Sequence, residues 1–282
     1  MSTPSTLDAS LVNRAAPPGS MRYFALLYAP EDRREVLTAL FVIDAEIRES
    51  AQSANHDVAH TRLRWWRAEV DRLVNGEAQH PASHVLRAQH RGPLSSLARL
   101  HEPIVAADMD LARMTYVNAR ELRAYCARSG GTVLELLAAE LSESGTLAES
   151  ARAAANALGI GIRQAEILRD LRQDAYDGRI YLPLEDLDRH SVPTEALSAR
   201  QIEANVRAAL QEFRDRALEN FSSPPLSAEE RSQLRPLWVL AALHRRLLDR
   251  IAARNYDVAS ERIELGPIEK SWVAWRAARK WG

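Results

Sequence analysis

The chain has a single cysteine, Cys126, among its 282 residues, which excludes an internal disulfide and suits a reducing compartment. It also has no run of 18 apolar residues free of charge, so no transmembrane helix is expected. The first twenty residues, MSTPSTLDASLVNRAAPPGS, lack the basic start and apolar stretch of a secretory signal. These absences together predict a cytoplasmic protein.

Neither sign of charge dominates, because 37 basic residues face 38 acidic ones and the formal net charge is −1. That balance gives no general footprint for nucleic-acid binding. Glycine is scarce, with 11 residues, whereas Ala, Leu, Arg and Glu are abundant, and this composition favours an all-α protein. Proline and glycine are spread evenly, which predicts one helical domain over residues 20–282. Residues 1–19 are expected to form a flexible N-terminal arm, stopped by Pro17-Pro18-Gly19.

A stripe of acidic residues marks the end of a long helix predicted over residues 151–176. Asp170 and Asp174 are four residues apart and therefore share one face, with Asp177 about one turn further on. Glu166 extends the same stripe backwards. For an arbitrary pair of this kind, a solvated helix face is the commoner explanation.

The residues around the stripe favour a second explanation, a site for a metal-bound diphosphate. Mg²⁺ is usually held by one or two carboxylates together with phosphate oxygens, and the pair Asp170 and Asp174 suits that role. Arg179 and Tyr181 follow just past the helix end. Both are candidates to contact phosphate oxygens, the arginine through its planar fork of donors.

The stretch ILRDLRQDAYDGRIYLP, residues 167–183, resembles the second aspartate-rich motif of the squalene/phytoene synthase family. Four further segments fit the same family in the same order. They are RYFALLYAPEDRREVLTALFVIDAEI (22–47), RLRWWRAEVDRLVNG with the later HP pair (62–76 and 80–81), DMDLARMTYVNARELRAYCARSGGTV (108–133) and RNYDVASERIELGPIEKSWVAWRAAR (254–279). The resemblance implies the all-α isoprenoid synthase fold around a central cavity, with Mg²⁺ as cofactor and a prenyl diphosphate as ligand.

The first aspartate-rich motif of that family, Asp-(Asp/Glu)-x-x-Asp, is degenerate in this chain. The matching residues are Arg48-Glu49-Ser50-Ala51-Gln52, so both terminal aspartates are absent and Glu49 is the acid that remains. Head-to-head coupling of prenyl diphosphates starts with loss of diphosphate, which metal ions assist. Arg48 places a positive charge where the family holds a cation.

Three explanations of this segment stay open. Asp44, Glu46 and Glu49 form a relocated acidic site, Arg48 itself binds a diphosphate, or residues 44–49 are a helix surface of mixed charge. The segment also resembles the family branch that contains the mitochondrial complex I assembly factor, in which the aspartate motifs are eroded.

Several other residues are weaker candidates. Tyr125 is a candidate contact to phosphate or to the reaction cavity, one turn before Gly130-Gly131, which the resemblance interprets as a break in a helix beside the substrate. Trp65-Trp66 fit either a prenyl-binding surface or core packing. Cys126 is expected to be buried and inert. The scattered histidines do not have zinc-ligand spacing.

The C-terminal tryptophans Trp272, Trp275 and Trp281 lie close to Arg276, Arg279 and Lys280. They fit either a peripheral contact with a membrane surface or, more simply, a packed terminal helix. A membrane-associated location therefore stays open beside the cytoplasmic one.

Two functional hypotheses follow. The first is a squalene/phytoene synthase-like prenyltransferase that binds prenyl diphosphate through Mg²⁺ and is weak or altered in activity, because its first motif is degenerate. The second is a catalytically inactive relative that acts as an assembly or binding factor. The intact Asp170/Asp174 pair leads us to expect an open apolar pocket between the helices around 21–48, 121–141 and 154–176, with the aspartates at its mouth.

Overall fold

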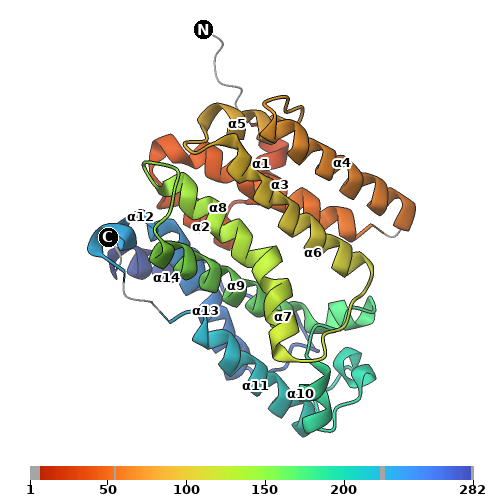
Figure 1. Cartoon of the computed structure of the whole chain (residues 1–282). Helices are drawn as coiled ribbons and strands as arrows, with labels where there is room; N and C mark the ends of the chain where they lie inside the picture. The colour runs from red at the N-terminus through yellow and green to blue at the C-terminus, as the bar shows by residue number, and fades with distance from the viewer. Residues whose placement is uncertain (1–6, 54, 223–225, 281–282) are drawn as a thin grey trace.

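The computed structural model describes residues 7–53, 55–222 and 226–280, and within them the regular structure is entirely helical. Figure 1 shows helices from the two halves of the chain packed side by side. The α-helices are α1 (Ala9–Ala15), α2 (Met21–Leu27), α3 (Arg34–Ala51), α4 (His56–Val74), α5 (Pro81–Gln89), α6 (His101–Leu111), α7 (Ala119–Cys126), α8 (Thr132–Leu141), α9 (Glu149–Tyr176), α10 (Leu184–Arg189), α11 (Ala204–Glu219), α12 (Ala228–Gln233), α13 (Arg235–Ala253) and α14 (Pro267–Lys280).

Helices α3 and α9 carry residues on two sides of the candidate site described below. Helix α3 packs against α4, α5 and α6, whereas α9 packs against α8, α11 and α13. Most of α3 is buried, including Leu40, Ile43 and Ile47, since apolar side chains cover more than one of its faces. The buried face of α9 carries small and aliphatic residues, such as Ala155, Ile160 and Leu168.

A π-helical turn, Ala127–Gly131, joins α7 to α8 instead of the break that the sequence suggested. A Cβ atom on Gly130 would lie 2.3 Å from the carbonyl oxygen of Gly159 on α9. Glycine is therefore needed on both helices because their backbones touch at this point. Turns of this kind are frequent at functional sites.

The predicted N-terminal arm contains helix α1. Asp8 caps α1 by accepting a hydrogen bond from the backbone of Ser10, and α1 packs on α3 with Ala15 buried. Residues 9–15 of the predicted arm therefore form a helix that contacts α3 and buries Ala15. Residues 1–6 lie outside the described part of the chain.

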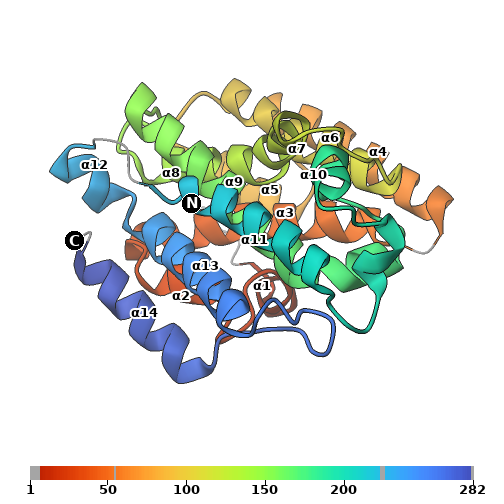
Figure 2. The ribbon, with the colours of Figure 1, turned by 90° about the horizontal axis from the view of Figure 1, so that it is seen from below.

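The other end of the chain forms an outer layer. Figure 2 shows α14 at the edge of the molecule, beside α13 and α2. Val273, Ala274 and Ala277 of α14 are buried in a small apolar cluster of their own with Val239 and Leu243 of α13. Among the described residues, no helix is long and apolar enough to cross a membrane.

Candidate diphosphate site

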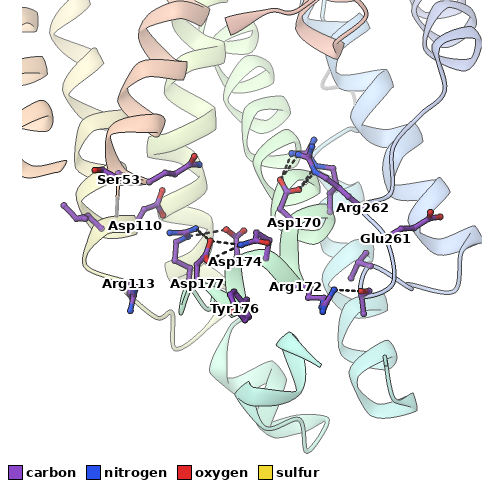
Figure 3. A pocket seen from close by; sticks show the side chains of 18 of the residues that line it. Ser53, Asp110, Arg113, Asp170, Arg172, Asp174, Tyr176, Asp177, Glu261 and Arg262 are labelled. Carbon is purple, nitrogen blue, oxygen red and sulfur yellow. Dashed lines mark hydrogen bonds and ion pairs between the residues drawn. The ribbon is translucent and has the colours of Figure 1, made fainter. Parts of the chain in front are cut away.

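A cavity of about 990 Å³ opens at the C-terminal end of α9, and the predicted acidic stripe lines it. Figure 3 shows Asp170, Asp174 and Asp177 along one wall, with Asp110 and Arg113 opposite and Arg262 above. Residues 258–262, which follow α13, and residues 51–53 at the end of α3 also line the cavity. Its wall carries both charges, which suits a charged ligand better than a purely apolar one.

Inside this opening is a smaller chamber of about 240 Å³. Guanidinium groups from α3, α9 and the two loops converge on it, together with the carboxylates of α9 and α6. The arginines are Arg48, Arg163, Arg169, Arg179 and Arg262, and the acids are Asp110, Glu166, Asp170 and Asp174. Five arginines in one chamber form a strong anion-binding environment, since each guanidinium presents several fixed donors.

The two aspartates of the second motif have different environments. Asp170 accepts hydrogen bonds from its neighbour Arg169 and from Arg262, at 2.9 and 2.8 Å. Burial raises the pKa of Asp170, but these two guanidinium groups outweigh it, so the pKa lies below its ordinary value. Asp170 is therefore an ionised carboxylate whose oxygens are already shared between two cations.

The negative charge of Asp174 is less well compensated by neighbouring arginines than that of Asp170. The guanidinium of Arg179 approaches one of its oxygens at 3.3 Å. Burial is the largest effect and, with the negative charge of Asp170, it raises the pKa of Asp174 to about 6, against the opposing charges of Arg163 and Arg179. A carboxylate with this environment gains most from one more cation.

Two tyrosines are linked in one network beside the chamber: Tyr181 lines the chamber, and Tyr125 is fully buried. The hydroxyls of Tyr125 and Tyr181 both donate to Asp110, at 3.0 and 2.7 Å. Arg163 in turn donates to the oxygen of Tyr125 at 2.6 Å and to that of Tyr181 at 3.2 Å. The structure thus brings the predicted residues Tyr125 and Tyr181 together. Burial raises the pKa of both hydroxyls, so both are neutral donors.

Arg48 connects the two sides of the site. Its guanidinium lies 3.0 Å from Asp44 on its own helix and 2.8 Å from Glu166 on α9. It also donates to the carbonyl of Ser129 in the π-helical turn at 3.4 Å. Despite its burial, Glu166 has a pKa well below its ordinary value, because Arg48 and Arg163 stabilise its charge. A guanidinium therefore neutralises these carboxylates.

The other acids of α3 do not join this site. Glu49, predicted as a metal ligand, is half exposed and pairs with Arg14 of α1 at 3.5 Å. Glu46 lies 3.4 Å from His80 instead. Glu46 and Glu49 thus point to different neighbours, and neither lines the chamber of Asp170 and Asp174, so Glu49 as a metal ligand stays a prediction.

The residues present fit Mg²⁺ only in part. Across the described residues, no group of three Asp, Glu, His or Cys side chains is arranged to hold a metal ion. Asp174 has an incompletely compensated carboxylate, whereas the oxygens of Asp170 already accept from arginines. This donor set fits an ion that brings most of its ligands with it, as Mg²⁺ does when phosphate oxygens complete its shell.

The apolar pocket predicted between the helices differs from what is found. Beyond the chamber, the space beside Asp44, Arg48, Ala106 and Tyr125 is only about 10 Å³. The side chain of Arg48 and its ion pairs with Asp44 and Glu166 occupy this inner part of the site. The cavities of about 990 and 240 Å³ lie at the aspartates.

The sequence did not single out several residues of this site, among them Arg163, Arg169, Asp110 and Arg262. Asp110 accepts from both tyrosines, and Arg262 binds Asp170 from 92 residues further along the chain. Asp110 lies within the family-like segment 108–133, which was a signal that it belonged to the site. Arg262 lies within the family-like segment 254–279, which was a signal of the same kind, whereas local spacing gives none.

Comparison with known proteins agrees with this architecture. The Squalene/phytoene synthase family model matches residues 16–269. The chain belongs to the squalene/phytoene synthase family.

Two relatives of this squalene/phytoene synthase family member show how far the similarity reaches. A 15-cis-phytoene synthase of Synechococcus elongatus is 30% identical over 255 residues, which cover 85% of this chain and 82% of the relative. Phytoene synthase 1 of Zea mays, a chloroplast enzyme, is 28% identical over 88% of this chain, but this match covers only 62% of its own length.

Solved structures show the same fold at lower identity. A dehydrosqualene synthase bound to a ligand superposes with a TM-score of 0.81 at 18% identity, over 96% of this chain and 95% of the other. A squalene synthase from Alicyclobacillus acidocaldarius gives 0.71 at 21% identity, over 89% and 98%. The predicted all-α isoprenoid synthase fold is thus confirmed.

Proposed function

We propose that this protein binds a prenyl diphosphate in the chamber at the end of α9 and belongs functionally to the head-to-head prenyltransferases of isoprenoid and carotenoid biosynthesis. The observation that carries the proposal is the convergence of five arginines and the α9 aspartates on one chamber of about 240 Å³. The phytoene synthase relatives support the substrate class.

The chain's own residues divide the work as follows. Arg179 and Arg262 lie beside Asp174 and Asp170 and would bind the diphosphate oxygens, with Arg48 behind them. Tyr181, which lines the chamber, and the buried Tyr125 are held by Asp110 and Arg163 and remain protonated. Mg²⁺, held at Asp174 with the adjacent Asp170, would supply Lewis-acid stabilisation of the leaving diphosphate.

Calorimetry with a farnesyl thiodiphosphate analogue tests the site. We expect tighter binding with Mg²⁺ than with EDTA, and loss of that difference in Asp174→Ala and in Asp170→Ala. Asp71→Ala, which changes a surface carboxylate on α4 paired with His101, should retain it. Binding independent of metal, or absent, would reject the site. Inorganic diphosphate as a second titrant shows whether the prenyl chain contributes to affinity.

A second candidate is a catalytically inactive relative that serves as an assembly or binding factor, comparable to the complex I assembly branch. The observation that favours it is the filled depth of the site, where about 10 Å³ remains beside Arg48. Long prenyl chains gain affinity from apolar burial, about 0.8 kcal/mol for each CH₂. Equal affinity for farnesyl thiodiphosphate and inorganic diphosphate would favour this second candidate.

A further inference from the structure

The outward face of α14 is unusual because large apolar side chains lie on it in the open. Ile268, Trp272 and Trp275 are 87%, 54% and 48% exposed, although the opposite face of the same helix is buried against α13. They are spaced by four and three residues, so they form one stripe along the helix. Exposed tryptophans on one stripe indicate a surface that something covers.

Arginines accompany this stripe. The guanidinium of Arg276 lies 5.2 Å from the ring centre of Trp272, and that of Arg279 lies 5.0 Å from that of Trp275. Within the described residues, Arg276 and Arg279 form no ion pair with a carboxylate, whereas Arg48 and Arg262 in the site do. Their charge is therefore available to an external anion.

The local charge is opposite to that of the whole chain. Helix α14 carries four basic residues and one acidic residue, Glu269, whereas the chain as a whole has a net charge of −1. Glu269 is already neutralised by Arg246 at 2.7 Å and by Arg250, both on α13. The face therefore presents tryptophan rings beside the positive charges of Arg276 and Arg279.

We propose that this face of α14 docks on an anionic lipid bilayer. Tryptophan is enriched at the membrane–water boundary, and arginine and lysine beside it are attracted to anionic headgroups. The contact is peripheral, because only one face of the helix is free and its other face belongs to the protein core. Trp281 lies outside the described residues.

The position of α14 gives the contact a consequence. The segment that precedes α14 contains residues 258–262, which line the cavity, and Arg262 binds Asp170. A lipid-docked α14 would hold this wall of the cavity close to the bilayer. The docking itself does not depend on the proposed ligand and can be tested without it.

Co-sedimentation of the full chain with vesicles tests the proposal. We expect binding to vesicles of phosphatidylcholine and phosphatidylglycerol in equal parts, at least about tenfold weaker binding to phosphatidylcholine alone, and weakening by salt. Arg276→Gln with Arg279→Gln should weaken vesicle binding about 30-fold. Each basic residue near an anionic surface contributes about 1 kcal/mol, so the loss of two corresponds to about 2 kcal/mol. Trp272→Ser with Trp275→Ser should weaken it at least about tenfold.

A matched control exists elsewhere on the surface. Trp65 on α4 is 40% exposed, and the guanidinium of Arg72 lies 5.5 Å from its ring centre. Trp65→Ser removes a tryptophan–arginine pair of the same kind and should leave vesicle binding unchanged. Circular dichroism confirms that each variant is folded.

Two results would overturn the proposal. The first is binding to neither kind of vesicle, or equal binding by the natural chain and both α14 variants. The second is a concentration-dependent dimer that both α14 variants abolish while vesicle binding is absent, since this would assign the face to a second copy of the chain.

Discussion

Arg48 of α3 and Glu166 of α9 form an ion pair, with 2.8 Å between the guanidinium nitrogen and the carboxylate oxygen. The two residues are 118 positions apart in the chain. In the family pattern, the helix of Arg48 carries the first metal motif and that of Glu166 leads into the second. An organic cation thus joins two helices that the family pattern joins through metal ions.

Removal of Arg48 should be costly for stability. Arg48→Ala leaves Asp44 and Glu166 buried without their shared cation, and breaking a buried pair in this way costs about 3 kcal/mol. Urea unfolding followed by circular dichroism measures the loss. Arg128→Ala is the control, since Arg128 pairs with Glu102 on the surface and should lose less than about 1 kcal/mol. Equal losses in the two variants would contradict a structural role for Arg48.

Turnover should be poor in the natural chain. Without an intact first motif, coupling of farnesyl or geranylgeranyl diphosphate is expected to be absent or at least about 100-fold slower than in family members with both motifs, the usual cost of losing one electrostatic stabiliser of the transition state. Chromatographic product analysis with Mg²⁺ measures it. Brisk formation of squalene or phytoene would contradict this prediction and favour a relocated acidic site.

Restoring the two aspartates of the first motif should make the thermal stability of the protein depend on Mg²⁺. Arg48→Asp with Gln52→Asp places two carboxylates four residues apart, close to Asp44 and Glu166. Their mutual repulsion should lower the melting temperature in EDTA, and Mg²⁺ should recover at least part of the loss. The natural chain without ligand should respond to Mg²⁺ less than this variant. An identical response in both would argue against metal binding between the two helices.

Asp174 and His244 should give opposite pH dependences of stability. The pKa of Asp174 is raised from its ordinary value of 3.8 to about 6, so the folded state holds a proton there that the unfolded state has lost. Its contribution to stability therefore falls as the pH rises from about 4 to 6. Burial lowers the pKa of His244 from 6.5 to about 4, so its contribution rises with pH over nearly the same range.

Substitution separates the two contributions. Asp174→Asn should make the slope of unfolding free energy against pH more positive between pH 4 and 6, by up to about 1.4 kcal/mol for each pH unit. His244→Gln should make it more negative. Urea unfolding at several pH values measures both slopes. A change of the same sign in both variants would contradict the assigned environments.

The contact between the π-helical turn and α9 should tolerate no methyl group. A Cβ on Gly159 would lie 2.3 Å from the carbonyl oxygen of Gly130, so Gly159→Ala should destabilise the protein by about 1–3 kcal/mol. The gain in helix propensity, about 1 kcal/mol, works in the opposite direction. Gly266→Ala is the control, because a Cβ there meets nothing within 4 Å. Thermal unfolding distinguishes the two. Stabilisation by Gly159→Ala would show that the helices are not in backbone contact.

The sequence alone predicted the all-α fold, the long helix that ends near residue 176 and the shared face of Asp170 and Asp174. These features depend on composition and on spacings of three and four residues, which local helix geometry fixes. The family resemblance also pointed to the site, because its motifs are contiguous in the chain. Cys126 is buried as predicted, and burial raises its pKa to about 12, so its thiol is not reactive.

Only the tertiary structure decided how Arg48 is used. Three explanations of residues 44–49 were compatible with the sequence, and the choice depends on which side chains of α3 face α9. The same is true of Arg262, of the packing of α1 on α3, and of the filled depth beside Tyr125. Contacts between residues about 90 to 120 positions apart leave no trace in local periodicity. These contacts form when several helices pack together, because charges that become buried must then neutralise one another.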